Sequence, residues 1–190
     1  MEDSKTAEKK FIAEVKTELG SGNVARVTHK LRELKSTGRV AILPYILDLL
    51  ANDKEDDAII NEVLQLVSDL KEQECAAVVA KYIEQRKLGK NTAAVVSACW
   101  QSRLNYSEHL SVFLDSFVLG DYQEAIEAFT VIEEMLWQLK QEKIADYRKQ
   151  LMERQSEIGV EKKPLYLELL KVLDDGITEN REDFPDLYKR

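Results

Sequence analysis

The chain has 190 residues, of which 44% are hydrophobic and 33% charged, and its net charge at pH 7 is −8. This composition excludes a largely disordered chain and is typical of one globular domain with a substantial core. No run of 18 apolar residues occurs and the N-terminal stretch alternates charged with apolar residues, so we expect neither a membrane span nor a signal peptide, and a cytoplasmic protein.

The charge is distributed unevenly along the chain. Residues 1–39 carry nine basic and six acidic side chains, residues 40–139 carry seven and seventeen, and residues 140–190 carry eleven and twelve. An acidic middle segment repels phosphate backbones, so nucleic acid is not an expected partner. The same acidity favours solubility or the attraction of a basic partner.

Helical periodicity extends through almost the whole chain, and no segment predicts a strand. Gly20 ends a first helix over residues 6–19, Asn23 caps the second, and Gly38 closes it. Pro44 is expected either in the first turn of the third helix or at a kink within it. The third helix is predicted over about 40–51, and the fourth follows the acidic turn and ends near Leu70. The fifth is predicted over about 74–86, the sixth over about 91–103, the seventh from Asn105 or Ser107 to near Gly120, and the eighth from Asp121 onward.

These helices recur as pairs with a regular period. The segments that begin at Pro44, Ala77 and Ser111 occupy comparable first-helix positions, at separations of 33 and 34 residues. The second helices contain "AIINEVLQLV", "TAAVVSACW" and "EAIEAFTVI". A two-helix unit repeated at this interval is typical of an α-solenoid, in which each hairpin buries its apolar face on its neighbours.

Two of these units, "ILPYILDLLANDKEDDAIINEVLQLVSDL" and "CAAVVAKYIEQRKLGKNTAAVVSACWQSRL", resemble HEAT repeats. The resemblance covers roughly residues 24–139 and is to HEAT-like proteins of bacteria. It implies an all-α fold, a short right-handed α-α superhelix, and no particular activity. The expected organisation is HEAT-like repeats with an N-terminal capping pair over 1–139, a helical extension and capping helix of the same domain over 140–175, and an acidic tail over 176–190.

The C-terminal third departs from the repeat. The eighth helix is predicted to continue without a breaker to Gly159, with a narrow apolar stripe of Ile144, Tyr147 and Leu151 in its extension. Pro164 then opens a helix that is apolar over much of its circumference and therefore needs cover from more than one side. We expect this helix to cap the last repeat; a homodimer contact is the alternative use.

Reactive residue types gather in "VSACWQSRLNYSEHL", residues 95–109. Cys99 shares a helical face with Val95 and Val96, which favours a buried thiol over a nucleophile paired with His109. The two cysteines, Cys75 and Cys99, are expected to be reduced and buried. The two cysteines and two histidines lack metal-ligand spacing, so we expect no metal, no cofactor and no catalytic residue.

The leading hypothesis is therefore a non-enzymatic interaction module or scaffold that binds a protein segment or basic peptide on an acidic, concave face formed by the second helices. Helical phase indicates six partner-binding residues: Glu62, Asp69, Ser97, Gln101, Glu127 and Glu134. The alternatives are an enzyme with a groove active site, either a hydrolase or a DNA-glycosylase-like protein, and a homo-oligomer assembled through residues 164–175. We expect the protein to be a monomer rather than a homodimer.

Overall fold

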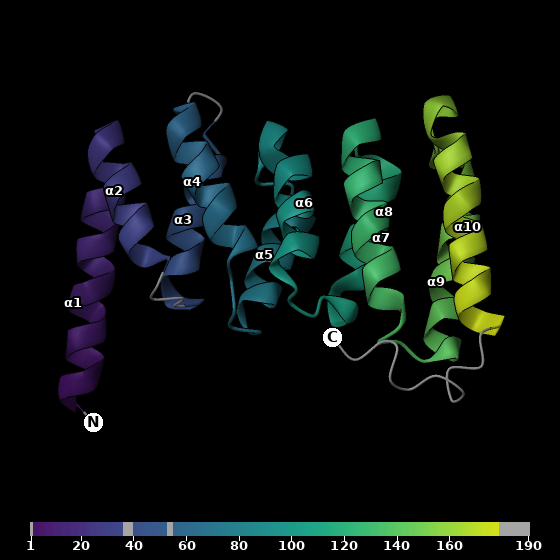
Figure 1. Ribbon diagram of the computed structural model, residues 1–190, viewed down its shortest axis with the longest axis horizontal. Coiled ribbons are helices and arrows are strands. Elements are labelled where there is room, and N and C mark those ends of the chain that lie inside the picture. Colours follow the sequence, from purple (N-terminus) through teal and green to yellow (C-terminus); the bar gives the residue numbers. More distant parts are fainter. Residues whose placement is uncertain (1, 36–39, 53–54, 179–190) are drawn as a thin grey trace. The chain divides into compact units, whose positions relative to one another are not determined.

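The structure is a computed structural model that describes residues 2–35, 40–52 and 55–178. All regular structure in these ranges is helical, as predicted (Figure 1). The α-helices are α1 (Glu2–Leu19), α2 (Val24–Leu34), α3 (Leu43–Leu50), α4 (Asp57–Ser68), α5 (Cys75–Glu84), α6 (Thr92–Ser102), α7 (Leu110–Leu119), α8 (Tyr122–Leu136), α9 (Gln141–Glu153) and α10 (Lys163–Thr178). Short 3-10 turns are η1 (Val40–Ile42), η2 (Gly89–Asn91), η3 (Ser107–His109), η4 (Gln155–Glu157) and η5 (Val160–Lys162).

The chain divides between Leu104 and Asn105 into two compact units, an N-terminal unit (Met1–Leu104) and a C-terminal unit (Asn105–Arg190). The sequence did not indicate this division. None of the helices within the described ranges has the length and apolar character needed to cross a membrane.

Several helix ends lie where the sequence predicts them, because polar side chains satisfy exposed backbone groups there. Asn23 caps α2 by accepting a hydrogen bond from the backbone N–H of Arg26 at 3.0 Å. Asp121 caps α8 in the same way, through the backbone N–H of Glu124 at 2.8 Å. Pro44 lies in the first turn of α3. The predicted helix end at Gly38 falls outside the described residues.

In the N-terminal unit the helices pack in two rows. In the even row, α4 packs against both α2 and α6; in the odd row, α3 packs against both α1 and α5. The rows join within each consecutive pair, α1 with α2, α3 with α4 and α5 with α6. The core between the rows is aliphatic. Its members include five side chains that are 0% exposed: Leu31, Leu47, Val63, Val79 and Val95.

In the C-terminal unit, α7 packs against α8, and α10 packs against both α9 and α8. The apolar stripe predicted for residues 140–151 is confirmed, since Ile144, Tyr147 and Leu151 are all buried. The unit also contains an aromatic contact in which the rings of Tyr106 and Phe113 meet edge to face with centroids 5.5 Å apart.

The prediction of one long eighth helix is wrong. α8 ends at Leu136, and α9 begins only at Gln141. Two tight backbone bonds close the last turn of α8, from Gln138 N–H to the carbonyl of Met135 and from Leu139 N–H to the carbonyl of Leu136, both at 3.0 Å. The chain then turns although the segment contains neither glycine nor proline.

α10 also extends further than predicted. Gly176, where the tail was expected to begin, is a buried residue of α10, and the helix continues to Thr178. Residues 179–190 of the expected tail lie outside the described residues.

The end of α7 is held by a buried lysine. The Lys162 ammonium donates hydrogen bonds to the carbonyls of Phe117 at 3.0 Å, Val118 at 2.7 Å and Gly120 at 2.8 Å. These carbonyls belong to the negative end of the helix, where a cation is favourable. Burial lowers the pKa of Lys162, while the charges of nearby carboxylates, including Glu124, act in the opposite direction.

Candidate functional site

The six side chains predicted to bind a partner are divided between the two units. Glu62 lies in α4, Asp69 directly follows it, and Ser97 and Gln101 lie in α6. All four belong to the even row of the N-terminal unit. The remaining two, Glu127 and Glu134, lie in α8 of the C-terminal unit. Each group is therefore described within its own unit.

Glu62 is already engaged by two cations, Arg32 in α2 and Lys35 directly after it. Its carboxylate lies 2.7 Å from the Arg32 guanidinium and 3.2 Å from the Lys35 ammonium. Burial raises the pKa of Glu62, but hydrogen bonds from Arg32 and Lys35 outweigh this effect, and the pKa lies below its ordinary value of 4.5. Glu62 thus joins α2 to α4, and its charge is compensated within the protein.

A second set of polar contacts joins α4 to α6. The Ser68 hydroxyl donates to Gln101 Oε1, and Gln101 Nε2 donates to the Ser97 hydroxyl, both at 3.2 Å. Lys35 also donates to Gln65 Oε1 at 2.7 Å. We call these side chains together the even-row surface: Arg32, Lys35, Glu62, Gln65, Ser68, Ser97 and Gln101. Three of the predicted residues therefore lie on one continuous polar surface.

The other predicted residues have simpler surroundings. Asp69 is exposed and forms the C-terminal boundary of α4, where its backbone N–H donates to the carbonyl of Gln65 at 3.0 Å. In α8, Glu127 is partly buried and accepts a hydrogen bond from Gln123 Nε2 at 3.0 Å. Glu134 is exposed.

A catalytic role for Cys99 would need an exposed thiol, and this thiol is buried. Cys99 is 0% exposed in α6 of the N-terminal unit, whereas His109 is partly buried in η3 of the C-terminal unit. Cys75 is also 0% exposed, and burial, with the charges of Glu72 and Glu74, raises its pKa to about 11. The prediction of two buried thiols is confirmed. Burial keeps reagents away from both thiols, and in Cys75 the raised pKa also disfavours the reactive thiolate.

Trp100 is the aromatic side chain of this region that faces solvent. It directly precedes Gln101 in α6 and is 39% exposed. A partly exposed tryptophan beside a polar surface is a frequent anchor in protein interfaces.

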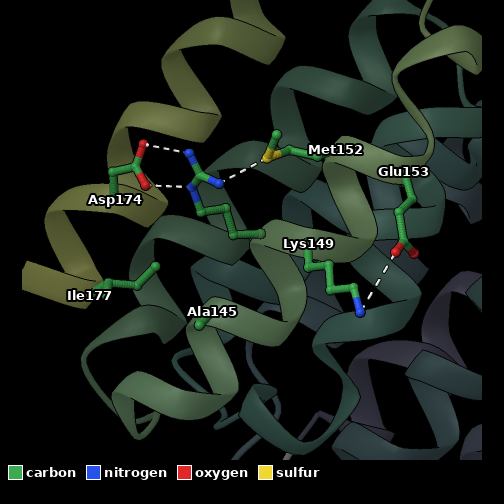
Figure 2. A pocket seen from close by; sticks show the side chains of 7 residues that line it. Ala145, Lys149, Met152, Glu153, Asp174 and Ile177 are labelled. Carbon is green, nitrogen blue, oxygen red and sulfur yellow. Dashed lines mark hydrogen bonds and ion pairs between the residues drawn. The ribbon is translucent and has the colours of Figure 1, made fainter.

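A groove between α9 and α10 was missed by the sequence analysis (Figure 2). The residues that line it are Ala145, Arg148, Lys149, Met152, Glu153, Asp174 and Ile177. The charged groups of the groove are paired with one another: Arg148 forms an ion pair with Asp174, and the Lys149 ammonium lies 3.8 Å from the Glu153 carboxylate. Figure 2 shows Lys149 and Glu153 side by side. Arg148 also donates to the sulfur of Met152 at 2.8 Å. The groove therefore presents balanced charge to solvent.

Nothing in the sequence pattern indicated this groove, because it depends on the turn between α8 and α9. With one continuous helix the residues of α9 would not face α10. Across residues 2–35, 40–52 and 55–178, no three His, Cys, Asp or Glu side chains are grouped so that they could hold a metal ion.

Comparison with known proteins gives no relative: no protein-family model, no curated protein and no solved structure matches this chain significantly.

Proposed function

We propose that this protein is a non-enzymatic interaction module, that its N-terminal unit is a short HEAT-like α-solenoid, and that a protein segment binds along the even-row surface. The two-row packing supports the solenoid, since each middle helix contacts the preceding and the following helix of its own row. Stacked hairpins of this kind create extended surfaces that suit peptide segments.

The observation that carries the proposal is the network of contacts between helices on the even-row surface. Glu62 is held by Arg32 in α2 and Lys35 directly after it, and Gln101 of α6 is held by Ser68 of α4. Side chains that are already fixed lose less conformational entropy when a partner binds. Trp100, partly exposed beside Gln101, supplies an apolar anchor.

The structure changes the chemistry that we assign to this surface. Because Glu62 is compensated by two cations, it gives little attraction for a basic peptide at this position. We therefore assign recognition of the bound protein segment to the amide and hydroxyl groups of Gln65, Ser97 and Gln101. The burial of Cys99 supports the non-enzymatic proposal by removing the one nucleophile that the sequence suggested.

The test compares two arginine substitutions of exposed glutamines. Gln101→Arg places a bulky charge at the α6 end of the even-row surface, and Gln85→Arg makes the same change at the end of α5 in the odd row. Both variants and the wild type are checked by circular dichroism and used for affinity capture from native lysate with mass-spectrometric identification.

We expect a protein that is retained by the wild type and by Gln85→Arg, and that is lost with Gln101→Arg. Equal retention by the two variants would place binding away from the even-row surface. Failure of the wild type to retain any protein would contradict the interaction-module proposal and direct attention to enzymatic assays.

Homo-oligomerisation is a second candidate function, and one observation favours it. Val160 is 75% exposed directly before α10, and Leu167 within α10 is 64% exposed. Light scattering should detect a dimer that Leu167→Lys dissociates and that the matched control Leu119→Lys, at a residue 59% exposed in α7, leaves intact. A wild-type monomer at working concentration would remove this candidate.

A further inference from the structure

A cavity of about 390 Å³ lies in the N-terminal unit beside the end of α1 and along α3. Its walls include the apolar side chains of Leu19 and Leu49 and the ring of Tyr45. Two carboxylates, Asp48 and Glu55, also line the cavity. The volume is at the low end for ligand sites and corresponds to one long side chain more closely than to a large cofactor.

The two carboxylates differ from Glu62 in one respect. Within the described part of the chain, neither Asp48 nor Glu55 takes part in an ion pair, whereas Glu62 has two cationic partners. Asp48 Oδ1 is held in place because it accepts a hydrogen bond from the Tyr82 hydroxyl at 2.7 Å. Glu55 accepts hydrogen bonds from Asn52 Nδ2 and from the backbone N–H of Asp56, each at 3.3 Å. Hydrogen bonds therefore hold both carboxylates in position.

The ring of Tyr45 already receives a cation. The Lys16 ammonium lies 4.7 Å from the centroid of that ring. This contact is a cation–π interaction, and its geometry shows that the ring face is accessible to positive charge. Lys16 is an exposed side chain of α1, so it can move aside for a cation that makes more contacts.

We propose that this cavity binds the guanidinium group of an arginine side chain from a protein partner. A guanidinium group can stack on the Tyr45 ring while its N–H groups donate to carboxylates such as Asp48 and Glu55, a combination that the ammonium of Lys16 cannot match. The aliphatic stem would pack against Leu19 and Leu49. The site lies beside the odd row, so the inference goes beyond the proposed function and does not depend on the even-row surface.

The test uses the full chain labelled with 15N and three short capped peptides, in which the central residue is arginine, lysine or citrulline. Citrulline has nearly the shape of arginine but carries no charge. Backbone amide shifts of Tyr45, Asp48, Leu49 and Glu55 are followed by NMR during each titration. We expect saturable shifts at these amides with the arginine peptide, and binding weaker by about tenfold or more with citrulline.

Two pairs of variants separate the cavity from general electrostatic attraction. Lys16→Met removes the competing ammonium and should tighten binding of the arginine peptide several-fold more than Lys10→Met, which makes the same charge change elsewhere on α1. Asp48→Asn should weaken binding about fivefold or more, whereas Asp57→Asn, at an exposed residue of α4, should leave it unchanged.

The inference is overturned if the arginine peptide causes no saturable shift at the cavity, or if citrulline binds equally well. It is also overturned if Lys16→Met and Lys10→Met have the same effect. Tighter binding of the lysine peptide than of the arginine peptide would contradict the guanidinium assignment. None of these outcomes bears on the Gln101→Arg test, so the two proposals can fail separately.

Discussion

At the scale of single residues, Arg86 stands out because it adopts a left-handed backbone conformation with φ of 52°. It is the second residue after α5, next to the cap residue Gln85. The backbone bonds around it form a Schellman motif: Arg86 N–H donates to the carbonyl of Ile83 at 2.9 Å, and Lys87 N–H donates to the carbonyl of Tyr82 at 3.2 Å. The Lys87 ammonium lies 5.4 Å from the centroid of the Tyr82 ring and covers the same turn. This position favours glycine, since a Cβ atom is strained in the left-handed region.

We therefore predict that Arg86→Gly stabilises the protein by about 0.5–1 kcal/mol. Arg86→Ala is the matched control, because it removes the same side chain but keeps the Cβ atom, and it should not stabilise. Urea unfolding followed by circular dichroism measures both changes as shifts in the midpoint. If the two variants have equal stability, the backbone of Arg86 carries no strain and this interpretation of the turn is wrong.

At the scale of helices, Lys162 connects the start of α10 to the end of α7. Replacing it with methionine keeps the buried stem but leaves the carbonyls of Phe117, Val118 and Gly120 without their donor. The loss of three charge-assisted hydrogen bonds exceeds the relief of the desolvation cost of the ammonium, so Lys162→Met should destabilise the protein by about 2–4 kcal/mol.

The adjacent Lys163 provides the control, because its side chain is exposed. Lys163→Met should change the free energy of unfolding by less than about 0.5 kcal/mol. Denaturant titration of both variants makes the comparison. A Lys162→Met variant as stable as the wild type would show that burial of the ammonium costs as much as its three hydrogen bonds contribute.

The ion pairs of Glu62 predict a dependence of stability on pH. The folded pKa of Glu62 lies below the ordinary value of 4.5, so the folded protein binds fewer protons than the unfolded chain near that pH. The contribution of Glu62 is therefore complete above about pH 4.5 and is lost as the pH falls through the lowered folded pKa.

Glu62→Gln should consequently destabilise the protein by about 1 kcal/mol at pH 7, and the difference from the wild type should shrink in acid. The measurement is the free energy of unfolding of both proteins between pH 7 and the lowest pH at which they remain folded. A difference that stays constant over this range would mean that the carboxylate charge is not what joins α2 to α4.

Helix positions were largely predictable, because capping residues and apolar spacing are local signals. Asn23, Pro44 and Asp121 mark helix starts correctly, and Ile144, Tyr147 and Leu151 identify the buried face of α9. The turn between α8 and α9 was missed because the residues that form it have no breaking tendency of their own. Only the packing of α9 and α8 on α10 requires the chain to turn there.

The candidate surface was predicted only in part, for a related reason. Helical phase shows that Glu62, Ser97 and Gln101 face outward, but it does not show which helices lie beside them. The cations that compensate Glu62 lie in α2 and directly after it, and Arg32 is 30 residues away in the sequence. The sequence therefore indicated that Glu62 could bind a basic partner, although in the fold its charge is already compensated by these cations.

At the scale of the whole molecule, the division into two units has a direct consequence for folding. The N-terminal unit has its own aliphatic core, and the C-terminal unit has its own core around Phe113 and Phe117. Compact units with separate cores can fold independently. We predict that fragments 1–104 and 105–190, produced separately, are each helical and each unfold cooperatively in urea.

Circular dichroism and denaturant titration of the two fragments test this prediction. If neither fragment shows a cooperative transition while the full chain does, stability depends on contact between neighbouring repeats across residue 104, as in an uninterrupted solenoid. That result would argue against two independent folding units, while the solenoid proposal would gain support.

The buried lysine and the buried cysteines also give each unit a chemical label of its own. Both cysteines of the chain lie in the N-terminal unit, and each is 0% exposed. Lys162, 3% exposed, lies in the C-terminal unit. A thiol reagent should therefore modify the native chain only when the N-terminal unit opens, and acylation of Lys162 should report opening of the C-terminal unit. Mass spectrometry of one doubly treated sample would time the opening of the two halves separately, without any mutation.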